Sequence, residues 1–489
     1  MARTHDILSF LASQGVAVRS LAADSRDVAA GDVFLAYPGE LNDGRAYIDA
    51  ALARGAAAVV YEARNAGVGA LNVPHLAIEN LRNEVAALAD EVYGRPSHTL
   101  WLAGVTGTNG KTSTTQWLAE SFRHLGKRCA VIGTLGNGFP GALVPSPNTT
   151  PNALVLQKAL RGFLDAGADA CAMEVSSIGI EEGRIDATRF AVAVFTNFTR
   201  DHLDYHGSME AYAEAKLRLF DWPGLKAAVI NLDDPFSQRI LDRIGGRIPC
   251  LGYTLEGNSA AVAECLSATN LDMRAGGLGF EVNGIPVQSA VIGRFNAANL
   301  LAVMAGLRAY GFTLAQAAVA VAGLQPPPGR MQTVVADSGS EQKPLVVVDY
   351  AHTPDALEKV LTTLHEVARA RGGKLHCVFG CGGDRDAGKR PLMGAVAERN
   401  ADRVTLTDDN PRSEEPAAIR AAIRSGMQTA PHIEPDRAVA IRSAIAGAQA
   451  ADVVLLAGKG HEDYQEIKGV KRPFSDLAEA KSALEVRAC

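Results

Sequence analysis

The strongest constraint on the fold is a repeated alternation of short apolar segments with longer helical runs. Strands that alternate with helices pair in parallel, because each helix returns the chain to the same edge of the sheet. This pattern predicts an α/β protein with a doubly wound parallel sheet at its centre. The apolar segments of the central part span residues 100–107, 129–133, 168–177, 190–198 and 226–234, and helical runs include 112–126 and 151–167.

Two breaks divide the 489 residues into three blocks. Gly94 and Pro96 interrupt regular structure, and three consecutive prolines at 326–328 form a stiff spacer. The last block repeats the alternation of strands and helices, which predicts a Rossmann-like domain. The predicted domains are a small N-terminal α/β domain at 1–96, the central domain at 97–327 and the C-terminal domain at 328–489.

Charge and hydropathy exclude several partners. The net charge is −6 and no long basic run occurs, which argues against nucleic acid as the main partner. The chain lacks a stretch of about 18 uncharged apolar residues, so no membrane span is expected. His5 and Asp6 precede only a short apolar run, which makes a poor signal peptide. We expect a cytoplasmic monomer that acts on small molecules.

Seven cysteines are scattered through the chain, a pattern typical of reduced cytoplasmic thiols rather than of a disulfide framework. Cys377 and Cys381 follow His376 closely enough to allow a metal site. The surrounding segment, 374–384, is better interpreted as a buried strand that runs into a glycine loop.

The segment LAGVTGTNGKTST, residues 102–114, is the strongest local signal. A strand ends in a glycine-rich turn, and Lys111 and Thr112 open a helix. Such a loop directs backbone N–H groups at phosphate oxygens, with the lysine on the β- and γ-phosphates and the hydroxyl on Mg²⁺. Val105 occupies the position of the first glycine in the common motif, so we expect Gly104 and Gly107 to make the turn. A turn without a ligand is the less favoured alternative.

An acid, a histidine and a lysine follow in the central block. Glu174 ends an apolar strand, where a carboxylate suits a Mg²⁺ that bridges phosphates. His202 is predicted to contact metal or phosphate, whereas His206 is expected to cap or to pack. Lys216 lies on a helix and, on its own, is typical of a salt-bridged or snorkelling side chain.

Taken together, these motifs resemble the Mur ligases, the ATP-dependent amide-forming enzymes of peptidoglycan synthesis. Segments near the N-terminus and in the last block resemble the branch that adds the third residue of the stem peptide. The resemblance covers all three blocks in order. The motifs that carry it are GTNGKT at 107–112, MEVSS at 173–177, the segment 196–207, AK at 215–216, GRFNAAN at 293–299, PGRM at 328–331, VDYAHTP at 348–354, and the segments 24–51, 380–394, 408–416 and 457–465.

The resemblance implies acyl activation by ATP. The γ-carboxylate of UDP-N-acetylmuramoyl-L-alanyl-D-glutamate is phosphorylated, an amino group of 2,6-diaminopimelate attacks, and ADP and phosphate leave. It implies catalytic roles for Lys111, Glu174, His202 and Lys216, with Lys216 carbamylated, and a Mg²⁺ set of Thr112, Glu174, His202 and Lys216. The implied ATP contacts are Gly107, Thr108, Asn109, Gly110, Lys111, Thr112, Ser113, Asn296, Arg330 and Asp349.

The resemblance also implies contacts to the nucleotide-sugar substrate. Ser25 on its own fits a simple turn, and the NTTP segment at 148–151 also fits a helix N-cap. Ile178 and Glu182 depart from the family pattern, which commonly has His and Gln there, and a carboxylate at Glu182 repels an anionic substrate unless it is paired. The implied contacts are Ala23, Ser25, Glu40, Leu41, Asn42, Asn148, Thr149, Thr150, Ser176, Glu182 and Arg184.

Arg412 is the residue that indicates which amino acid is added. Diaminopimelate is lysine with an extra carboxylate, which an arginine binds through two parallel N–H donors. The same arginine repels the ammonium of lysine. Pro411 stiffens the turn, and Ser413 is expected to cap a helix. A plain turn with surface charge is the alternative. The implied amino-acid contacts are Arg385, Asp409, Asn410, Pro411, Arg412, Gly458 and Glu462.

Three rival interpretations remain. Arg412 argues against the lysine-adding relative, and the N-terminal block argues against a ligase like folylpolyglutamate synthase. A catalytically inactive nucleotide-binding regulator is disfavoured by the intact Lys111, His202 and Lys216, together with Glu174.

Overall fold

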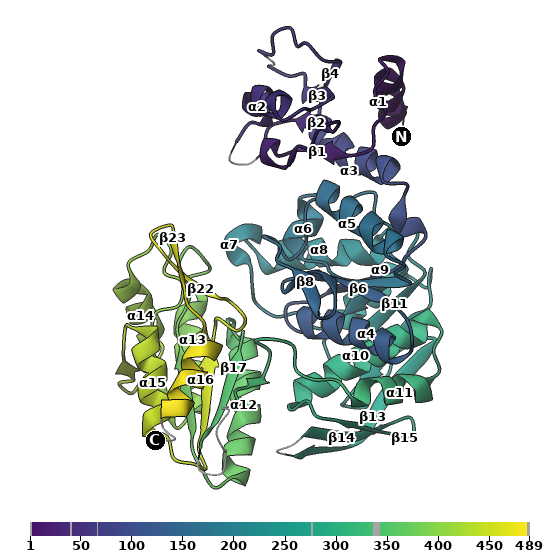
Figure 1. Ribbon diagram of the computed structural model, residues 1–489. Helices are drawn as coiled ribbons and strands as arrows, with labels where there is room; N and C mark the ends of the chain where they lie inside the picture. Colours follow the sequence, from purple (N-terminus) through teal and green to yellow (C-terminus); the bar gives the residue numbers. More distant parts are fainter. Residues whose placement is uncertain (1, 40–41, 66, 275–276, 336–342, 487–489) are drawn as a thin grey trace. The chain divides into compact units, whose positions relative to one another are not determined.

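The computed structural model describes residues 2–39, 42–65, 67–274, 277–335 and 343–486 (Figure 1). The predicted α/β class with mainly parallel sheets is confirmed. The chain folds into two compact units. The first unit is Met1–Gly104, Lys127–Val192 and Asp221–Lys226, and the second is Val105–Gly126, Ala193–Phe220 and Ala227–Cys489. The predicted domain boundaries after residues 96 and 327 stay predictions.

The first unit begins with a four-stranded parallel sheet in the order β1-β2-β3-β4. Alternate residues of β2 face two apolar cores, with Val33 and Leu35 on the side of α1 and α3 and Phe34 and Ala36 on the side of α2. The elements are α1 (Ala2–Ser13), β1 (Leu21–Ala22), η1 (Ser25–Asp27), β2 (Val33–Ala36), η2 (Gly44–Tyr47), α2 (Ile48–Ala53), β3 (Ala58–Glu62), β4 (His75–Ile78), α3 (Leu81–Val92) and η3 (Pro96–His98).

The rest of the first unit contributes to the central block. Strand β6 pairs with β9 in parallel, and β7 and β8 add an antiparallel extension that the sequence pattern did not predict. The chain passes from the first unit into the second along β5. The elements are β5 (Trp101–Thr106), β6 (Cys129–Gly133), β7 (Gly136–Phe139), β8 (Ala142–Val144), α5 (Ala153–Asp165), β9 (Ala170–Glu174) and α6 (Ser177–Glu181).

The second unit holds the remaining part of the central block. Strands β11, β12 and β13 pair in parallel, and β14 and β15 add an antiparallel edge, as is common in large sheets. The elements are α4 (Lys111–His124), β10 (Val192–Phe195), α7 (Leu203–His206), α8 (Met209–Leu217), η4 (Arg218–Asp221), β11 (Ala227–Asn231), α9 (Phe236–Ile244), β12 (Cys250–Thr254), β13 (Glu264–Arg274), β14 (Gly277–Val282), β15 (Ile285–Ser289), α10 (Arg294–Tyr310) and α11 (Leu314–Ala322).

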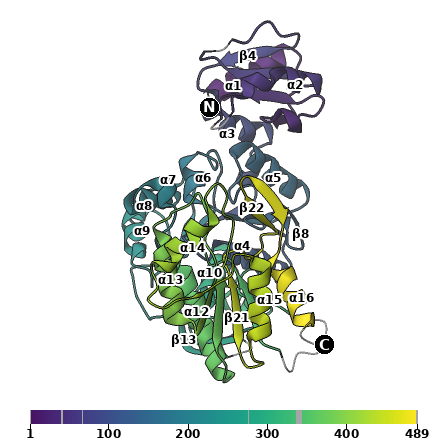
Figure 2. The same ribbon diagram turned by 90° about the vertical axis from the view of Figure 1, so that its left-hand side faces the viewer.

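The C-terminal part of the second unit is a doubly wound sheet in the order β16-β17-β21-β18-β19-β20. One core contains residues of α12, α13 and α14, and the core on the other face contains residues of α15 and α16 (Figure 2). The elements are β16 (Gln332–Thr333), β17 (Leu345–Asp349), α12 (Pro354–Ala370), β18 (Leu375–Phe379), α13 (Lys389–Asn400), β19 (Arg403–Leu406), α14 (Pro416–Arg424), β20 (His432–Ile433), α15 (Arg437–Gly447), β21 (Val453–Ala457), β22 (Tyr464–Ile467), β23 (Val470–Pro473) and α16 (Asp476–Val486).

Helix α14 begins at Pro416, so the helix start expected at Ser413 is wrong. The hydroxyl of Ser413 donates to Asp384 at 2.6 Å, and Glu414 accepts two hydrogen bonds from Arg390. These long-range contacts hold residues 413 and 414 in a loop against the 384–390 segment, which local sequence cannot reveal. Among the described ranges, no helix combines the length and the apolar character that a membrane span requires.

A buried ion pair between Arg437 and Asp476 joins α15 to α16. Both side chains are 0% exposed, and Nε and Nη2 of Arg437 each donate to Asp476 at 2.7 Å. Removal of one partner leaves an uncompensated buried charge. We expect Asp476→Ala to lower the free energy of unfolding of the full chain by about 3–5 kcal/mol, as measured by urea denaturation.

The matched control is Glu479→Ala. Arg442 and Glu479 pair at 2.8 Å across the same two helices, but at the surface. An exposed pair contributes about 0–1 kcal/mol, so this variant should unfold close to the parent. Equal losses of stability in the two variants would contradict the prediction.

Candidate active site

The glycine-rich loop lies between β5 and α4. Its two left-handed positions are Gly107, with φ 148°, and Gly110, with φ 85°. Nζ of Lys111 folds back over the loop and donates to the carbonyls of Gly107 at 2.7 Å and Thr108 at 2.8 Å. The expectation that Gly104 helps to turn the loop is wrong, because Gly104 lies inside β5. A Cβ there would lie 2.8 Å from the ring of Phe190, so close packing explains this glycine.

The segment after β10 holds the loop in shape. Oγ1 of Thr196 donates to the carbonyl of Asn109 at 2.6 Å, and the backbone N–H of Asn109 donates to Oδ1 of Asn197 at 2.9 Å. The side-chain amide of Asn109 donates to Asp355 at 3.1 Å, at the start of α12. Strand, loop and helix N-terminus together form the arrangement that binds phosphate.

Two further residues predicted to contact ATP lie near this loop. The guanidinium of Arg330 lies 4.4 Å from the ring centroid of Tyr350, and Nη2 donates to Oγ1 of Thr112 at 3.2 Å. Oδ1 of Asn296 accepts from Asn299, whose side chain packs against Gly110. The structure therefore brings Arg330 and Asn296 to the phosphate loop.

Asp349 is buried at the end of β17. Its carboxylate accepts from the N–H groups of Met331 and Ala351, both at 2.7 Å. Burial raises the pKa of Asp349, while Arg330 and these two N–H groups oppose the rise.

Of the other predicted ATP contacts, Ser113 is buried in the first turn of α4, and Oγ1 of Thr108 donates to the carbonyl of Thr199 at 3.0 Å.

Lys216 reaches the phosphate loop from α8. Its side chain is 1% exposed, its Nζ donates to the carbonyl of Gly107 at 2.9 Å, and it lies 4.5 Å from the ring centroid of Tyr212. Burial and the nearby Lys111 hold the pKa of Lys216 well below its usual range. The amine is therefore held toward its neutral form, which is the nucleophilic one.

Asp201 lies between two histidines. His202 Nε2 lies 3.4 Å from its carboxylate, and His352 Nε2 lies 3.9 Å from the same oxygen. Burial lowers the pKa of each imidazole to about 4, so both rings are neutral at neutral pH. Burial opposes ionisation of Asp201, but the charge interactions with His202, His352 and Lys389, together with the N–H of His202, outweigh it and lower the pKa of Asp201 to about 2.

Sequence reasoning missed Asp201 and His352 as members of this cluster. The signal was present in the segments DHLDYHG and VDYAHTP, each of which places a histidine in the loop that follows a strand: β10 ends at Phe195 and β17 at Asp349. Their proximity depends on the pairing of segments far apart in the chain, which periodicity does not reveal.

Glu174 ends β9 in the first unit, whereas Thr112, His202 and Lys216 belong to the second. The Glu174 carboxylate accepts from the backbone N–H of Thr134 at 2.8 Å and from its hydroxyl at 3.1 Å. A buried carboxylate with fixed oxygens is the donor type that Mg²⁺ prefers.

The predicted dipeptide contacts form a hydrogen-bonded group in the first unit. Thr150 Oγ1 lies 3.0 Å from Ser176 Oγ, and Nη1 of Arg184 donates to the carbonyl of Thr150 at 2.9 Å. Nε of Arg184 also donates to Glu182 at 2.6 Å. This pairing neutralises the carboxylate that departs from the family pattern. Thr149 Oγ1 lies 3.1 Å from Thr134 Oγ1 and Asn148 is exposed.

In the N-terminal sheet region, Ser25 is buried in η1, whose N-cap is Asp24. Ala23 is half-buried, and the carbonyl of Asn42 accepts from Gly39 N–H at 2.8 Å. The predicted contacts Glu40 and Leu41 lie outside the described residues.

Arg412 stands in a left-handed conformation with φ 51°. Its Nη1 donates to the carbonyl of Gly383 at 2.6 Å, and its Nε lies 3.7 Å from Glu466. A Cβ at Gly382 would lie 2.9 Å from Arg412 Nη1 and 3.9 Å from Cγ of Arg385, so both predicted arginines border this glycine. Arg385 itself is exposed.

The loop after β21 brings Gly458 and Glu462 to the same region. A Cβ at Gly458 would lie 2.6 Å from Oδ2 of Asp409, and Glu462 accepts from the side-chain amide of Asn410 at 2.8 Å. Burial, followed by the charge of Asp409, raises the pKa of Glu462. A Cβ at Gly329 would collide with the backbone of Gly460 and His461, so the linker before Arg330 touches this loop.

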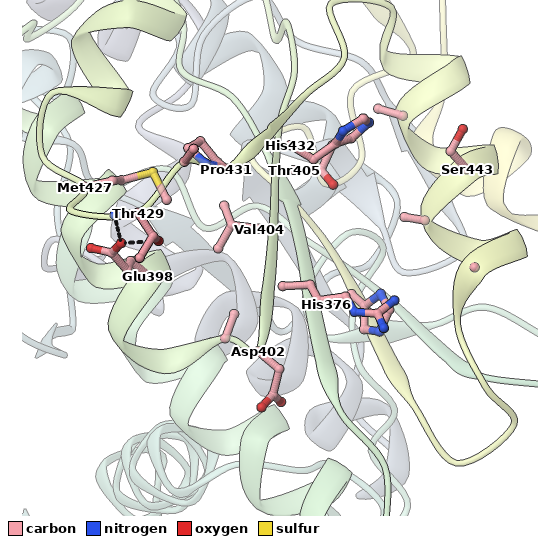
Figure 3. A pocket seen from close by; sticks show the side chains of 16 residues that line it. His376, Glu398, Asp402, Val404, Thr405, Met427, Thr429, Pro431, His432 and Ser443 are labelled. Carbon is pink, nitrogen blue, oxygen red and sulfur yellow. Dashed lines mark hydrogen bonds between the residues drawn. The ribbon is translucent and has the colours of Figure 1, made fainter.

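A cavity of about 580 Å³ in the C-terminal part contains none of the predicted site residues (Figure 3). It includes His376, whose ring lies 3.2 Å from Asp452. Cys377 and Cys381 are buried, and in the described part of the chain no group of three or more His, Cys, Asp or Glu side chains is arranged to hold a metal ion.

Comparison with known proteins identifies the class. Three family models match in order: the Mur ligase family catalytic domain at residues 17–93, the Mur ligase middle domain at 105–307, and the Mur ligase glutamate ligase domain at 329–460. The chain belongs to the Mur ligase family, so the predicted enzyme class, a ligase, is confirmed.

The chain is similar over almost its whole length to relatives named UDP-N-acetylmuramoyl-L-alanyl-D-glutamate–2,6-diaminopimelate ligase. That of Chromobacterium violaceum is 50% identical over 97% of this chain and 96% of the relative. That of Pseudomonas aeruginosa is 52% identical with the same coverage. A solved structure of a ligase with this name is 39% identical, with a TM-score of 0.64 and 96% of each chain covered. The MurF ligase of Thermotoga maritima, 20% identical with a TM-score of 0.68 over 96% of this chain and 98% of that one, shares the fold.

Proposed function

We propose that this chain joins the γ-carboxylate of UDP-N-acetylmuramoyl-L-alanyl-D-glutamate to an amino group of 2,6-diaminopimelate, in peptidoglycan synthesis. Relatives about half identical over nearly their full length carry this name. The observation in the structure that carries the proposal is the clustering of Arg412, Asn410 and Glu462. Asn410 is hydrogen-bonded to Glu462 and, through the backbone of Glu466, to Arg412. The cluster offers a guanidinium for a carboxylate and an acid for an ammonium.

ATP is the phosphate donor in this proposal. The N-terminus of α4 and the N–H groups of the 107–112 loop face the phosphates, and Lys111 leaves its loop carbonyls to reach them. Arg330, stacked on Tyr350, and buried Asp349 bind the nucleoside side. The acyl phosphate that forms is then attacked by the amine. Positioning of the reacting groups and neutralisation of their charge account for most of the rate enhancement in enzymatic phosphoryl transfer.

The proposed Mg²⁺ ligands are the hydroxyl of Thr112, the carboxylate of Glu174, the imidazole of His202 and a carbamate on Lys216. Each of these side chains is suited to a metal by its chemistry: His202 is neutral at neutral pH, and the carboxylate oxygens of Glu174 are held by Thr134. An ammonium repels a cation, but the depressed pKa of Lys216 favours the neutral amine that adds to CO₂ and releases a proton. When bound, Mg²⁺ would neutralise phosphate charge.

The three substrates are divided among the predicted domains in this scheme. Residues 1–96 bind the UDP group, with Ala23, Ser25, Glu40, Leu41 and Asn42 as the contacts. Residues 97–327 supply the phosphate loop, and 328–489 bind the amino acid and, through Arg330 and Asp349, the nucleoside. The muramoyl dipeptide is bound by Thr150, Ser176 and Arg184, with Asn148 and Thr149 beside them. The proposal includes a cytoplasmic location and a monomer.

Phosphate release from ATP tests the proposal directly. The full chain is supplied with the UDP-muramoyl dipeptide and with meso-diaminopimelate, L-lysine or no amine. We expect release with diaminopimelate and little with lysine, because Arg412 repels the lysine ammonium. Equal or faster turnover with lysine would assign the chain to the lysine-adding ligase. Absence of turnover with every amine would favour an inactive nucleotide-binding regulator.

A further inference from the structure

Lys459 is a fully buried cation that the proposed mechanism does not use. Its side chain is 0% exposed in the loop that follows β21. Nζ donates to Oδ1 of Asn410 at 3.0 Å and to Oε2 of Glu462 at 3.2 Å, and lies 3.7 Å from Oδ1 of Asp409. A buried charge is tolerated only when it is paired and hydrogen-bonded. These three partners all belong to the predicted amino-acid site.

Asn410 connects Lys459 to Arg412. Besides accepting from Lys459, Oδ1 of Asn410 accepts from the N–H of Glu466 at 3.0 Å. The carbonyl of Glu466 in turn accepts from the N–H of Arg412 at 3.0 Å. Arg412 has a left-handed backbone, which a non-glycine residue keeps only where its surroundings hold it. The chain of hydrogen bonds that begins at Lys459 is part of that support.

Lys459 also sets the charge of Glu462. Asp409 and Glu462 share this one ammonium. Burial and Asp409 raise the pKa of Glu462, and Lys459 opposes that rise. Without the ammonium, Glu462 would take up a proton at a higher pH. A protonated Glu462 no longer attracts the ammonium of an incoming amino acid.

We propose that Lys459 is a positioning residue for the amino-acid substrate. It keeps Glu462 ionised and fixes Asn410, and through Asn410 it supports the backbone of Arg412. It is enclosed by protein, so it acts through these neighbours. The inference rests on the proposed function, since Glu462 and Arg412 matter here as contacts to diaminopimelate.

The test is Lys459→Met in the full chain, with phosphate release measured against diaminopimelate and against ATP. We expect KM for diaminopimelate to rise about tenfold to a hundredfold, the range for lost hydrogen bonds to a charged group, with KM for ATP unchanged. The difference in KM for diaminopimelate between the variant and the parental chain should shrink as pH rises, because Glu462 of the variant then ionises. A purely structural defect would raise both KM values and would not follow pH in this way.

Lys471→Met is the matched control. Lys471 is exposed and lies 4.2 Å from the ring centroid of Tyr464, the ring that Lys459 approaches from 5.7 Å. This variant also exchanges a lysine for methionine beside Tyr464, and it should keep the parental KM for diaminopimelate. Lys459→Gln, which keeps a hydrogen-bond donor without the charge, replaces the methionine variant if that one does not fold.

The outcomes separate the two proposals. A parental chain that does not use diaminopimelate overturns the proposed function. A parental chain that uses it, with an unchanged KM in both Lys459 variants, overturns the inference alone. A parallel rise of KM for ATP also overturns it, because that result assigns Lys459 a general structural role.

Discussion

Replacing Arg412 with alanine should lower kcat/KM for diaminopimelate by about 30-fold to several thousandfold. Truncating one partner of a buried charge pair costs about 2–5 kcal/mol, and each 1.36 kcal/mol corresponds to about tenfold in rate. Nη1 of Arg412 donates to the carbonyl of Gly383, and neither residue is among the predicted ATP contacts. Steady-state phosphate release should therefore show an unchanged KM for ATP.

Arg472→Ala is the control for this variant. Arg472 is an exposed arginine on β23, the strand that pairs with β22 beside Arg412. It removes the same charge from the same neighbourhood without removing the predicted carboxylate contact. A loss of ATP affinity in Arg412→Ala as large as the loss of diaminopimelate use would refute the assignment.

Lys216→Ala is expected to abolish turnover, a loss of about three orders of magnitude or more. The variant removes a metal ligand in the proposed scheme, and a metal contributes several kcal/mol to stabilising transition-state charge. A small added carboxylate, such as acetate or formate, should restore part of the activity by replacing the lost carbamate oxygens. The measurement is phosphate release with and without the added acid.

The control is Lys226→Ala, which removes an exposed lysine. Lys216→Met addresses packing, since it fills the space beside Tyr212 without offering an amine. If Lys216→Ala keeps the parental activity, Lys216 is not a metal ligand. Acetate should raise the activity of Lys216→Ala more than it raises that of the parental chain. An equal effect on both would contradict the proposed carbamate.

Sequence reasoning was reliable where one short segment carries the whole structural signal. The strand, loop and helix around Lys111 are local, so their order and the α/β class could be predicted. Relatives with matching names confirm the family that the motifs indicated. The roles of the individual site residues stay predictions.

The rest depended on contacts between distant segments. Glu182 looked like an unpaired acid until the structure showed Arg184 beside it. Gly104 was mistaken for a turn residue because the ring of Phe190, which forbids a side chain there, comes 86 positions later. Lys459 gave no signal at all, since a lysine between two glycines is usually exposed. Only the fold shows that it is fully buried against Asn410.

The contact of Gly329 with Gly460 and His461 has a further consequence. One neighbour of Gly329 in the chain is Arg330, assigned to the nucleotide, and the loop that it touches carries Glu462, assigned to the incoming amine. A Cβ at position 329 would collide with the backbone nitrogen of His461, and backbone atoms have no rotamers by which they could move aside. Any side chain at position 329 would therefore displace the loop that carries Glu462, so this glycine is required for the shape of the predicted amino-acid site.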